Sequence, residues 1–249
     1  MPVELQSFQF HSFLKQLEER QLADLRFSEV TRALRALSSA YVERRETALA
    51  EHKALDGAGK RAAFALYYGP LHFQLVQHII RELAIVPRPG IVVDLGCGTG
   101  VAGAAIASSV TPPLRVFGVD THPWTLDEAR FTYKTFGLSA DVRRSHAART
   151  RLPAGTSIVV AAFVVNELKD QERADLLAQI KQARISTLII EPISQRISPW
   201  WSEWAAAFES MGGRADTWKA RIDPPPTVKR LAKAAGLRPE MLTARSLFI

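Results

Sequence analysis

A glycine-rich turn placed directly after an apolar run is the feature that most constrains the fold of this 249-residue chain. The apolar run 91–95 is typical of a buried parallel strand. It is followed by three alternating glycines, Gly96, Gly98 and Gly100. Glycine adopts strained turn conformations and has no Cβ to keep a ligand away. A small-residue helix predicted over 101–107 would add free N–H groups at its start. With the carboxylate of Asp94, this turn suits a ligand that carries an ammonium and a carboxylate.

A second apolar strand is predicted over 114–120, and it also ends in an acid, Asp120. A carboxylate at the tip of the second strand of such a fold can accept hydrogen bonds from both ribose hydroxyls. The ligand is therefore expected to carry a nucleoside. Gly98, Gly100 and Gly103 also match the dinucleotide pattern G-x-G-x-x-G. However, residues 94–97 intervene before the first of these glycines, and the carboxylate of Asp94 would repel a pyrophosphate.

Asp94 followed by the three alternating glycines resembles the first motif of class I S-adenosylmethionine-dependent methyltransferases. The resemblance covers roughly residues 85–249 and implies an α/β fold with a seven-stranded, mostly parallel, doubly wound (Rossmann-like) sheet whose last strand is antiparallel. It implies S-adenosyl-L-methionine as the cofactor, with the glycines at its methionine part, Asp94 near its ammonium and Asp120 at its ribose. The cofactor-binding residues expected on this basis are Asp94, Gly96, Cys97, Gly98, Gly100, Asp120, Thr121, His122, Ser145 and His146.

Alternating strand and helix patterns after residue 90 predict the parallel sheet independently of this resemblance. Further strands are expected near 140–145, over 157–163 and over 187–191, and helices over about 170–183 and 228–235. The segments 218–222 and 243–248 are expected to close the sheet as an antiparallel pair. Residues 1–55, 60–68 and 71–84 are predicted to be helical, with breaks at 56–59 and at Gly69-Pro70. We therefore expect an N-terminal helical extension or lid (1–84) and a cofactor-binding domain (85–249).

Three short motifs suggest a narrower likeness. They are Tyr68-Gly69-Pro70-Leu71-His72, Asn166-Glu167-Leu168 and Ile190-Glu191-Pro192. They resemble bacterial relatives of the methyltransferase-like factors of mitochondrial small-ribosomal-subunit assembly. Those factors carry cysteines for a metal cluster, whereas Cys97 is the single cysteine here, so no metal site and no internal disulfide are expected. Cys97 itself is interpreted as a small filler of the turn.

The acceptor of the methyl group should lie at the carboxyl ends of the fourth and fifth strands. Asn166, Glu167 and His72 are the catalytic candidates. Asn166 would contact the acceptor or cap the next helix. Glu167 would act as a base or form a surface salt bridge, and His72 would accept a proton or pack inside a helix interface. The substrate-contacting candidates are Tyr67, Tyr68, Glu191 and Trp201. Glu191 is expected to pair with an arginine or touch the ligand, while Trp204 and Phe208 are expected in the core.

Composition limits the partners. The chain has a net charge of +7, and basic residues cluster at 143–151 and at 229–238. These clusters either form a solvated face or attract an anionic partner such as RNA. No membrane-spanning run and no signal peptide are found, so a cytoplasmic location is expected.

The sequence therefore predicts an S-adenosylmethionine-dependent methyltransferase that acts on a small molecule in preference to RNA. The alternative is a non-catalytic RNA-binding or ribosome-assembly protein that retains the fold. An NAD-dependent oxidoreductase is disfavoured by Asp94. The sequence does not determine the acceptor or the oligomeric state.

Overall fold

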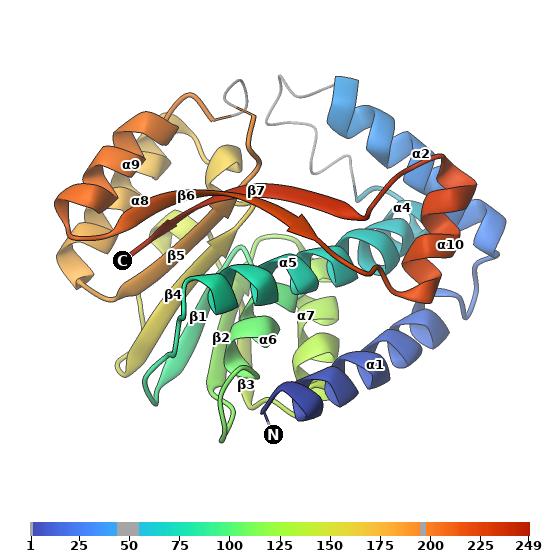
Figure 1. The fold of residues 1–249 in the computed structure, drawn as a ribbon, viewed down its shortest axis with the longest axis horizontal. Coiled ribbons are helices and arrows are strands. Elements are labelled where there is room, and N and C mark those ends of the chain that lie inside the picture. The colour runs from blue at the N-terminus through green and yellow to red at the C-terminus, as the bar shows by residue number, and fades with distance from the viewer. Residues whose placement is uncertain (1, 44–54, 195–197) are drawn as a thin grey trace.

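A seven-stranded sheet forms the centre of the protein in the computed structural model, which describes residues 2–43, 55–194 and 198–249. The strand order is β3-β2-β1-β4-β5-β7-β6. Figure 1 shows helices on both faces of this twisted sheet. The predicted fold class is thus confirmed.

The strands lie close to the predicted positions. Their bounds are Ile91–Leu95 (β1), Arg115–Asp120 (β2), Ala140–Arg144 (β3), Thr156–Ala162 (β4), Ser186–Glu191 (β5), Arg214–Arg221 (β6) and Met241–Phe248 (β7). The pairs from β3 to β5 are parallel, and β7 runs antiparallel to both β5 and β6. The predicted closing pair is therefore present, although β6 begins four residues earlier than 218. Because β1, β2, β4 and β5 are parallel, their carboxyl ends meet at one edge, where ligands bind in open α/β sheets.

One face of the sheet is covered by the N-terminal helices together with α6, α7 and α10, and these share one apolar core with it. The bounds on this side are Pro2–Gln21 (α1), Phe27–Glu43 (α2), Ala58–Ala63 (α4), Phe64–Tyr68 (η1, a π-helical turn), Gly69–Glu82 (α5), Val101–Ala107 (α6), Pro123–Thr135 (α7) and Pro226–Ala235 (α10). The core is continuous from α1 to the sheet, which explains how the extension is held. The proposed division at residue 84 stays a prediction.

The other face is covered by α8 (Asp170–Ala183) and α9 (Trp201–Ser210), with short 3₁₀ turns at Ala147–Arg149 (η2) and Val165–Glu167 (η3). Trp204 and Phe208 are buried in this second core, as predicted, at 2% and 0% exposure. Trp200 is also buried, whereas Trp201 is half-buried.

Two predictions about the N-terminal helices are wrong. Gly69-Pro70 does not interrupt the helix, since α4, η1 and α5 form one continuous helical run from Ala58 to Glu82. Pro70 is accommodated because it occupies the first turn of α5, where a missing N–H costs little. In addition, α1 and α2 are separated by a turn at 22–26. Part of the predicted helical stretch 1–55 lies outside the described residues.

Candidate functional site

In the glycine turn after β1, Gly96 and Gly100 are closely packed, whereas Gly98 faces open space. A Cβ at Gly96 would overlap the side chain of Val164, and one at Gly100 would lie 2.9 Å from the Cα of Ala129 in α7. Gly98 has a φ of +52°, and a Cβ built on it would meet nothing within 4 Å. The outer two glycines are therefore needed for packing, and the middle one leaves space in which a ligand can approach the backbone.

Asp94 is buried beneath this turn rather than exposed on it. The carboxylate is 1% exposed and accepts hydrogen bonds from the Gly103 N–H at 2.8 Å and from the Tyr133 hydroxyl at 2.9 Å. Burial raises the pKa of Asp94 from 3.8 to about 6, although both hydrogen bonds oppose that rise. Asp94 thus links the end of β1 to α6 and α7 through these two hydrogen bonds. Its predicted contact with an ammonium stays a prediction.

Asp120 lies on the open side of the turn, at the end of β2. One carboxylate oxygen accepts from the Gly98 N–H and the other from the His122 N–H, each at 2.9 Å. A carboxylate has about four lone-pair positions, so two remain for ribose hydroxyls. His122 caps α7, because its Nδ1 accepts from the Trp124 N–H at 3.2 Å. The structure thus brings Gly98, Asp120 and His122 together.

The remaining cofactor candidates surround this position. Cys97 is 5% exposed, and burial raises the pKa of its thiol well above the ordinary value, which supports its interpretation as a filler. Thr121 is exposed. The hydroxyl of Ser145 lies 2.9 Å from that of Thr150, and His146 lies 3.5 Å from Glu172. Their contacts with an adenine stay predictions.

Three acceptor-side candidates form an aromatic cluster above the end of β4. The ring of His72 stacks on Phe163 with centroids 4.2 Å apart, and the Tyr68 ring lies 6.0 Å away. Tyr67 contacts Tyr68 edge-on at 5.1 Å. Burial lowers the pKa of His72 to about 4, so the imidazole is neutral at pH 7. Burial also raises the pKa of Tyr67 to about 12, so this phenol keeps its proton.

Phe163 belongs to this cluster, and the sequence analysis did not find it. It follows β4 directly with a φ of +63°, which is rare for a non-glycine residue. Such a conformation costs about 1–3 kcal/mol and persists where the surroundings impose it. Nothing in the local sequence signals its place in the cluster, because its ring stacks on His72 of α5, which is distant in sequence.

The other acceptor-side candidates form a separate polar cluster on the α9 side of the sheet. Glu191 is fully buried and accepts hydrogen bonds from the N–H groups of Val165 (2.7 Å) and Asn166 (3.3 Å), and from the Asn166 side-chain amide. The Asn166 oxygen accepts from Ser198 and from the indole N–H of Trp200. The helix-capping alternative for Asn166 is wrong, because Lys169 is the N-cap of α8.

Glu167 is exposed beside this cluster, and its predicted role as a base or salt-bridge partner stays a prediction. Trp201 stacks on Arg245 of β7, with the guanidinium carbon 4.1 Å from the ring centroid. The acceptor candidates are thus divided between two core clusters rather than gathered in one place.

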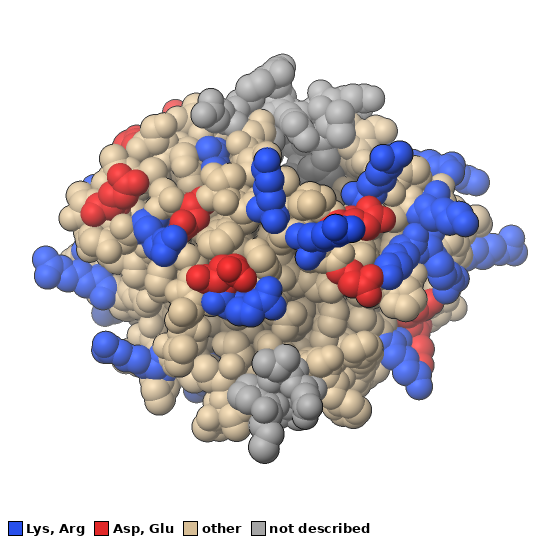
Figure 2. Space-filling view, in the orientation of Figure 1, with Lys and Arg blue, Asp and Glu red and all other residues tan. Residues whose placement is uncertain are grey.

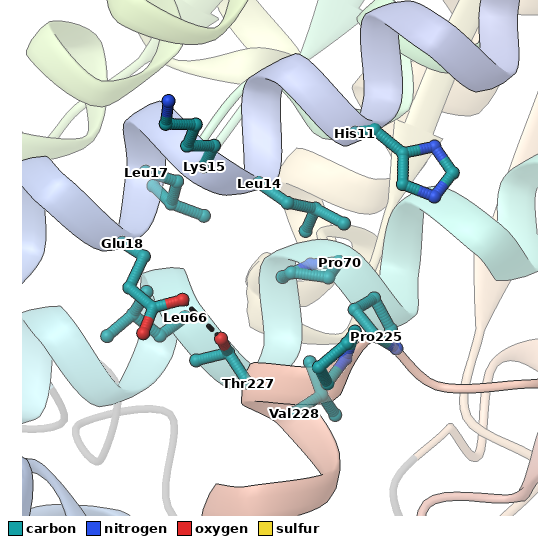
Figure 3. Close-up of a pocket in the computed structure, with 11 residues that line it drawn as sticks. His11, Leu14, Lys15, Leu17, Glu18, Leu66, Pro70, Pro225, Thr227 and Val228 are labelled. Atoms are coloured by element: carbon teal, nitrogen blue, oxygen red, sulfur yellow. Dashed lines mark hydrogen bonds between the residues drawn. The ribbon is translucent and has the colours of Figure 1, made fainter.

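Surface features lie away from this site. A pocket of about 190 Å³ between α1, the start of α5 and α10 contains none of the predicted site residues (Figure 3). Basic side chains gather over α2 and α10 (Figure 2). There Arg32 and Arg35 line a shallow groove of about 370 Å³. Within the described residues, no helix has the length and apolarity to cross a membrane, and no group of His, Cys, Asp and Glu is placed to hold a metal ion.

Comparisons with known proteins agree with this geometry. The methyltransferase domain family matches residues 92–184, which include the turn, Asp120 and the β4 edge. Mitomycin 7-O-methyltransferase is 16% identical, with a TM-score of 0.51 over 90% of this chain and 67% of that one. Precorrin-6y C5,15-methyltransferase from Geobacter metallireducens is 10% identical, with a TM-score of 0.50 over 71% of this chain and 88% of that one. No curated protein matches the sequence.

Residues 92–184 thus match a methyltransferase domain, and the fold that contains them is that of known methyltransferases.

Proposed function

We propose that this chain binds S-adenosylmethionine at the β1 turn and transfers its methyl group to an acceptor at the β4–β5 edge. The observation that carries the proposal is Gly98, whose left-handed backbone and open side lie beside the Asp120 carboxylate. The left-handed backbone favours glycine there, and the missing Cβ lets a ligand approach the backbone beside the Asp120 carboxylate.

The residues present suit this cofactor. The Asp120 oxygens keep lone pairs for two ribose hydroxyls after accepting from Gly98 and His122. Thr121, His122, Ser145 and His146 surround the adenine position. Asp94 stabilises the turn by accepting a hydrogen bond from Gly103, and its negative charge favours a nearby ammonium. The cofactor supplies an activated methyl group, so the chain mainly aligns the acceptor, an effect worth about 7–11 kcal/mol at most.

We assign His72 as the proton acceptor for a hydroxyl or amine acceptor on its position, since burial, which lowers its pKa to about 4, also makes it a weak base. Its imidazole is neutral at pH 7, and it lies against Phe163 and Tyr68 at the β4 edge. The aromatic surroundings favour a flat, partly apolar small molecule as the acceptor in preference to RNA.

Calorimetry with S-adenosylhomocysteine tests the cofactor site. Asp120→Ala should weaken binding by at least about tenfold, since hydrogen bonds from two hydroxyls to a charged group are lost. Asp127→Ala, which removes an exposed carboxylate of α7, is the matched control. Equal affinities of wild type and Asp120→Ala would remove Asp120 from the site. Transfer of a tritiated methyl group to cell extract, with and without ribonuclease, then separates the acceptor classes.

A second candidate function is RNA binding without methyl transfer, and the basic surface of α2 and α10 favours it. Arg230 lies over Phe27 at 4.8 Å, beside the groove lined by Arg32 and Arg35. If this surface binds RNA, affinity should fall steeply with salt, and the triple change Arg32→Glu, Arg35→Glu, Arg230→Glu should abolish it. Retention of extract methylation by that triple variant would favour the enzyme.

A further inference from the structure

Arg245 is a buried cation at the carboxyl edge of the sheet, and the methyltransferase chemistry described above does not use it. It lies in β7, opposite Glu191, the last residue of β5. The residue is 5% exposed, and the face of its guanidinium is covered by the ring of Trp201. Arginine is rarely buried to this degree unless it is paired.

The hydrogen-bonding edge of Arg245 has no hydrogen-bond partner among the described residues. Within the described part of the chain, the buried Nε and Nη2 atoms of Arg245 form no hydrogen bond. These two nitrogens donate in parallel and bind a carboxylate or phosphate through two oxygens. The same edge is filled in two exposed arginines of this chain. Arg143 donates from Nε and Nη2 to Asp141 at 3.0 and 2.7 Å, and Arg214 donates to Asp216 at 2.7 and 2.6 Å.

Glu191 does not fill this edge although it faces Arg245 across the two strands. Its oxygens accept instead from the backbone of η3 and from the Asn166 amide. These hydrogen bonds hold the carboxylate toward β4. A buried donor without a partner costs free energy, and a native structure normally offers an explanation such as a ligand.

We propose that Arg245 binds a carboxylate or phosphate group of the methyl acceptor through its Nε–Nη2 edge. This inference rests on the proposed methyltransferase function. Trp201, the half-buried member of the pair, stacks on the guanidinium of Arg245, and this contact keeps the fork oriented. Since β7 lies two strands beyond β4, the anionic group of the acceptor would be roughly 10 Å from the β4 edge, given a strand spacing of about 4.8 Å.

Nitrogen-15 NMR of the full chain tests the site directly through the Arg Nε–H signals. The Arg245 signal is assigned by its loss in Arg245→Lys, with Arg245→Gln as a second assignment variant if the first does not fold. Wild type is then titrated with acetate, with inorganic phosphate and with the neutral isostere acetamide. We expect a saturable shift of the Arg245 signal with the anions, no shift with acetamide, and no shift of the Arg214 signal, whose edge is already filled. The tighter of the two anions identifies carboxylate or phosphate as the group bound.

An Arg245 signal that responds equally to acetamide, or to no probe, would overturn the proposal. So would an anion affinity, measured by calorimetry, that is the same in wild type and in a folded Arg245→Lys variant, where loss of the fork should weaken binding by about tenfold. S-adenosylhomocysteine binding is measured on the same samples. If it is present while the anion response is absent, the Arg245 site fails and the methyltransferase proposal stands. If it is absent, the cofactor proposal fails on its own.

Discussion

Replacing Asp94 by asparagine should make the protein increasingly more stable than wild type as the pH rises from about 4 to 7. The folded-state pKa of Asp94 is raised from 3.8 to about 6, so the native state holds its proton more tightly than the unfolded state. Between these values the unfolded chain binds fewer protons, and wild-type stability therefore falls as the pH rises. The shift of about 2.2 units corresponds to about 3 kcal/mol, at about 1.36 kcal/mol per unit.

The asparagine side chain of the Asp94→Asn variant does not titrate, and its amide oxygen can still accept from the Gly103 N–H and the Tyr133 hydroxyl. The substitution also changes stability by an amount that does not depend on pH. That amount does not affect how the difference in unfolding free energy between the two proteins varies with pH. Urea unfolding at pH 4, 5, 6 and 7 measures this difference. Thermal unfolding offers a second readout, because a gain of about 3 kcal/mol shifts the midpoint temperature by about 6–12 °C in a chain of this size.

Asp127→Asn is the matched control, because it removes an exposed carboxylate from α7 without touching the turn. If the difference in unfolding free energy between wild type and Asp94→Asn does not change across this pH range, ionisation of Asp94 does not destabilise the folded protein, and the reasoning is refuted. The same variant should bind S-adenosylhomocysteine more weakly if the Asp94 charge serves the ammonium. In that case the protein keeps a destabilising charge because function requires it.

Two further predictions concern the turn and the aromatic cluster. Gly98→Ala places a Cβ in open space at a φ of +52°, so it should cost only about 1–2 kcal/mol of stability while weakening S-adenosylhomocysteine binding in calorimetry; unchanged binding would show that no ligand occupies that space. His72→Gln should lower methyl transfer to cell extract without changing cofactor affinity. Because the pKa of His72 is about 4, the wild-type rate should show no inflection from this residue between pH 5 and 8, and one that disappears in the variant would contradict its assignment as a neutral base.

The cofactor half of the site was predictable because its signals are local. The turn, Asp94 and Asp120 follow from an apolar run, three glycines and an acid at a strand tip, all within 30 residues. The helix predicted over 170–183 agrees with α8 because its apolar residues recur at helical spacing. The helix boundaries were less predictable. Proline usually marks the end of a helix, but Pro70 occupies the first turn of α5, where it is tolerated.

The acceptor half was not predictable, because it depends on contacts between distant segments. Arg245 and Glu191 meet through the β5–β7 register, and no local pattern sets that register. The one available sequence signal is an arginine within an otherwise largely apolar stretch of the predicted strand 243–248. No sequence signal pointed to Phe163, since its ring contact is with His72 in a distant segment. The division of the candidates into two clusters follows from the helices that carry them, since η1 and α5 pack in the core on one side of the sheet and α9 packs in the core on the other.

Val164 is where the two halves of the site meet. Its side chain packs on Gly96 of the cofactor turn, and the next residue, Val165, donates its N–H to Glu191 of the polar cluster. Val164→Ala would leave a gap beneath the turn and should weaken S-adenosylhomocysteine binding, with a stability cost of about 1–3 kcal/mol. Arg245→Lys should leave that affinity unchanged, because Arg245 contacts Trp201 and faces Glu191 rather than the residues of the cofactor turn. If both variants lose cofactor binding equally, the two clusters act as one unit, and the acceptor edge then helps to shape the turn.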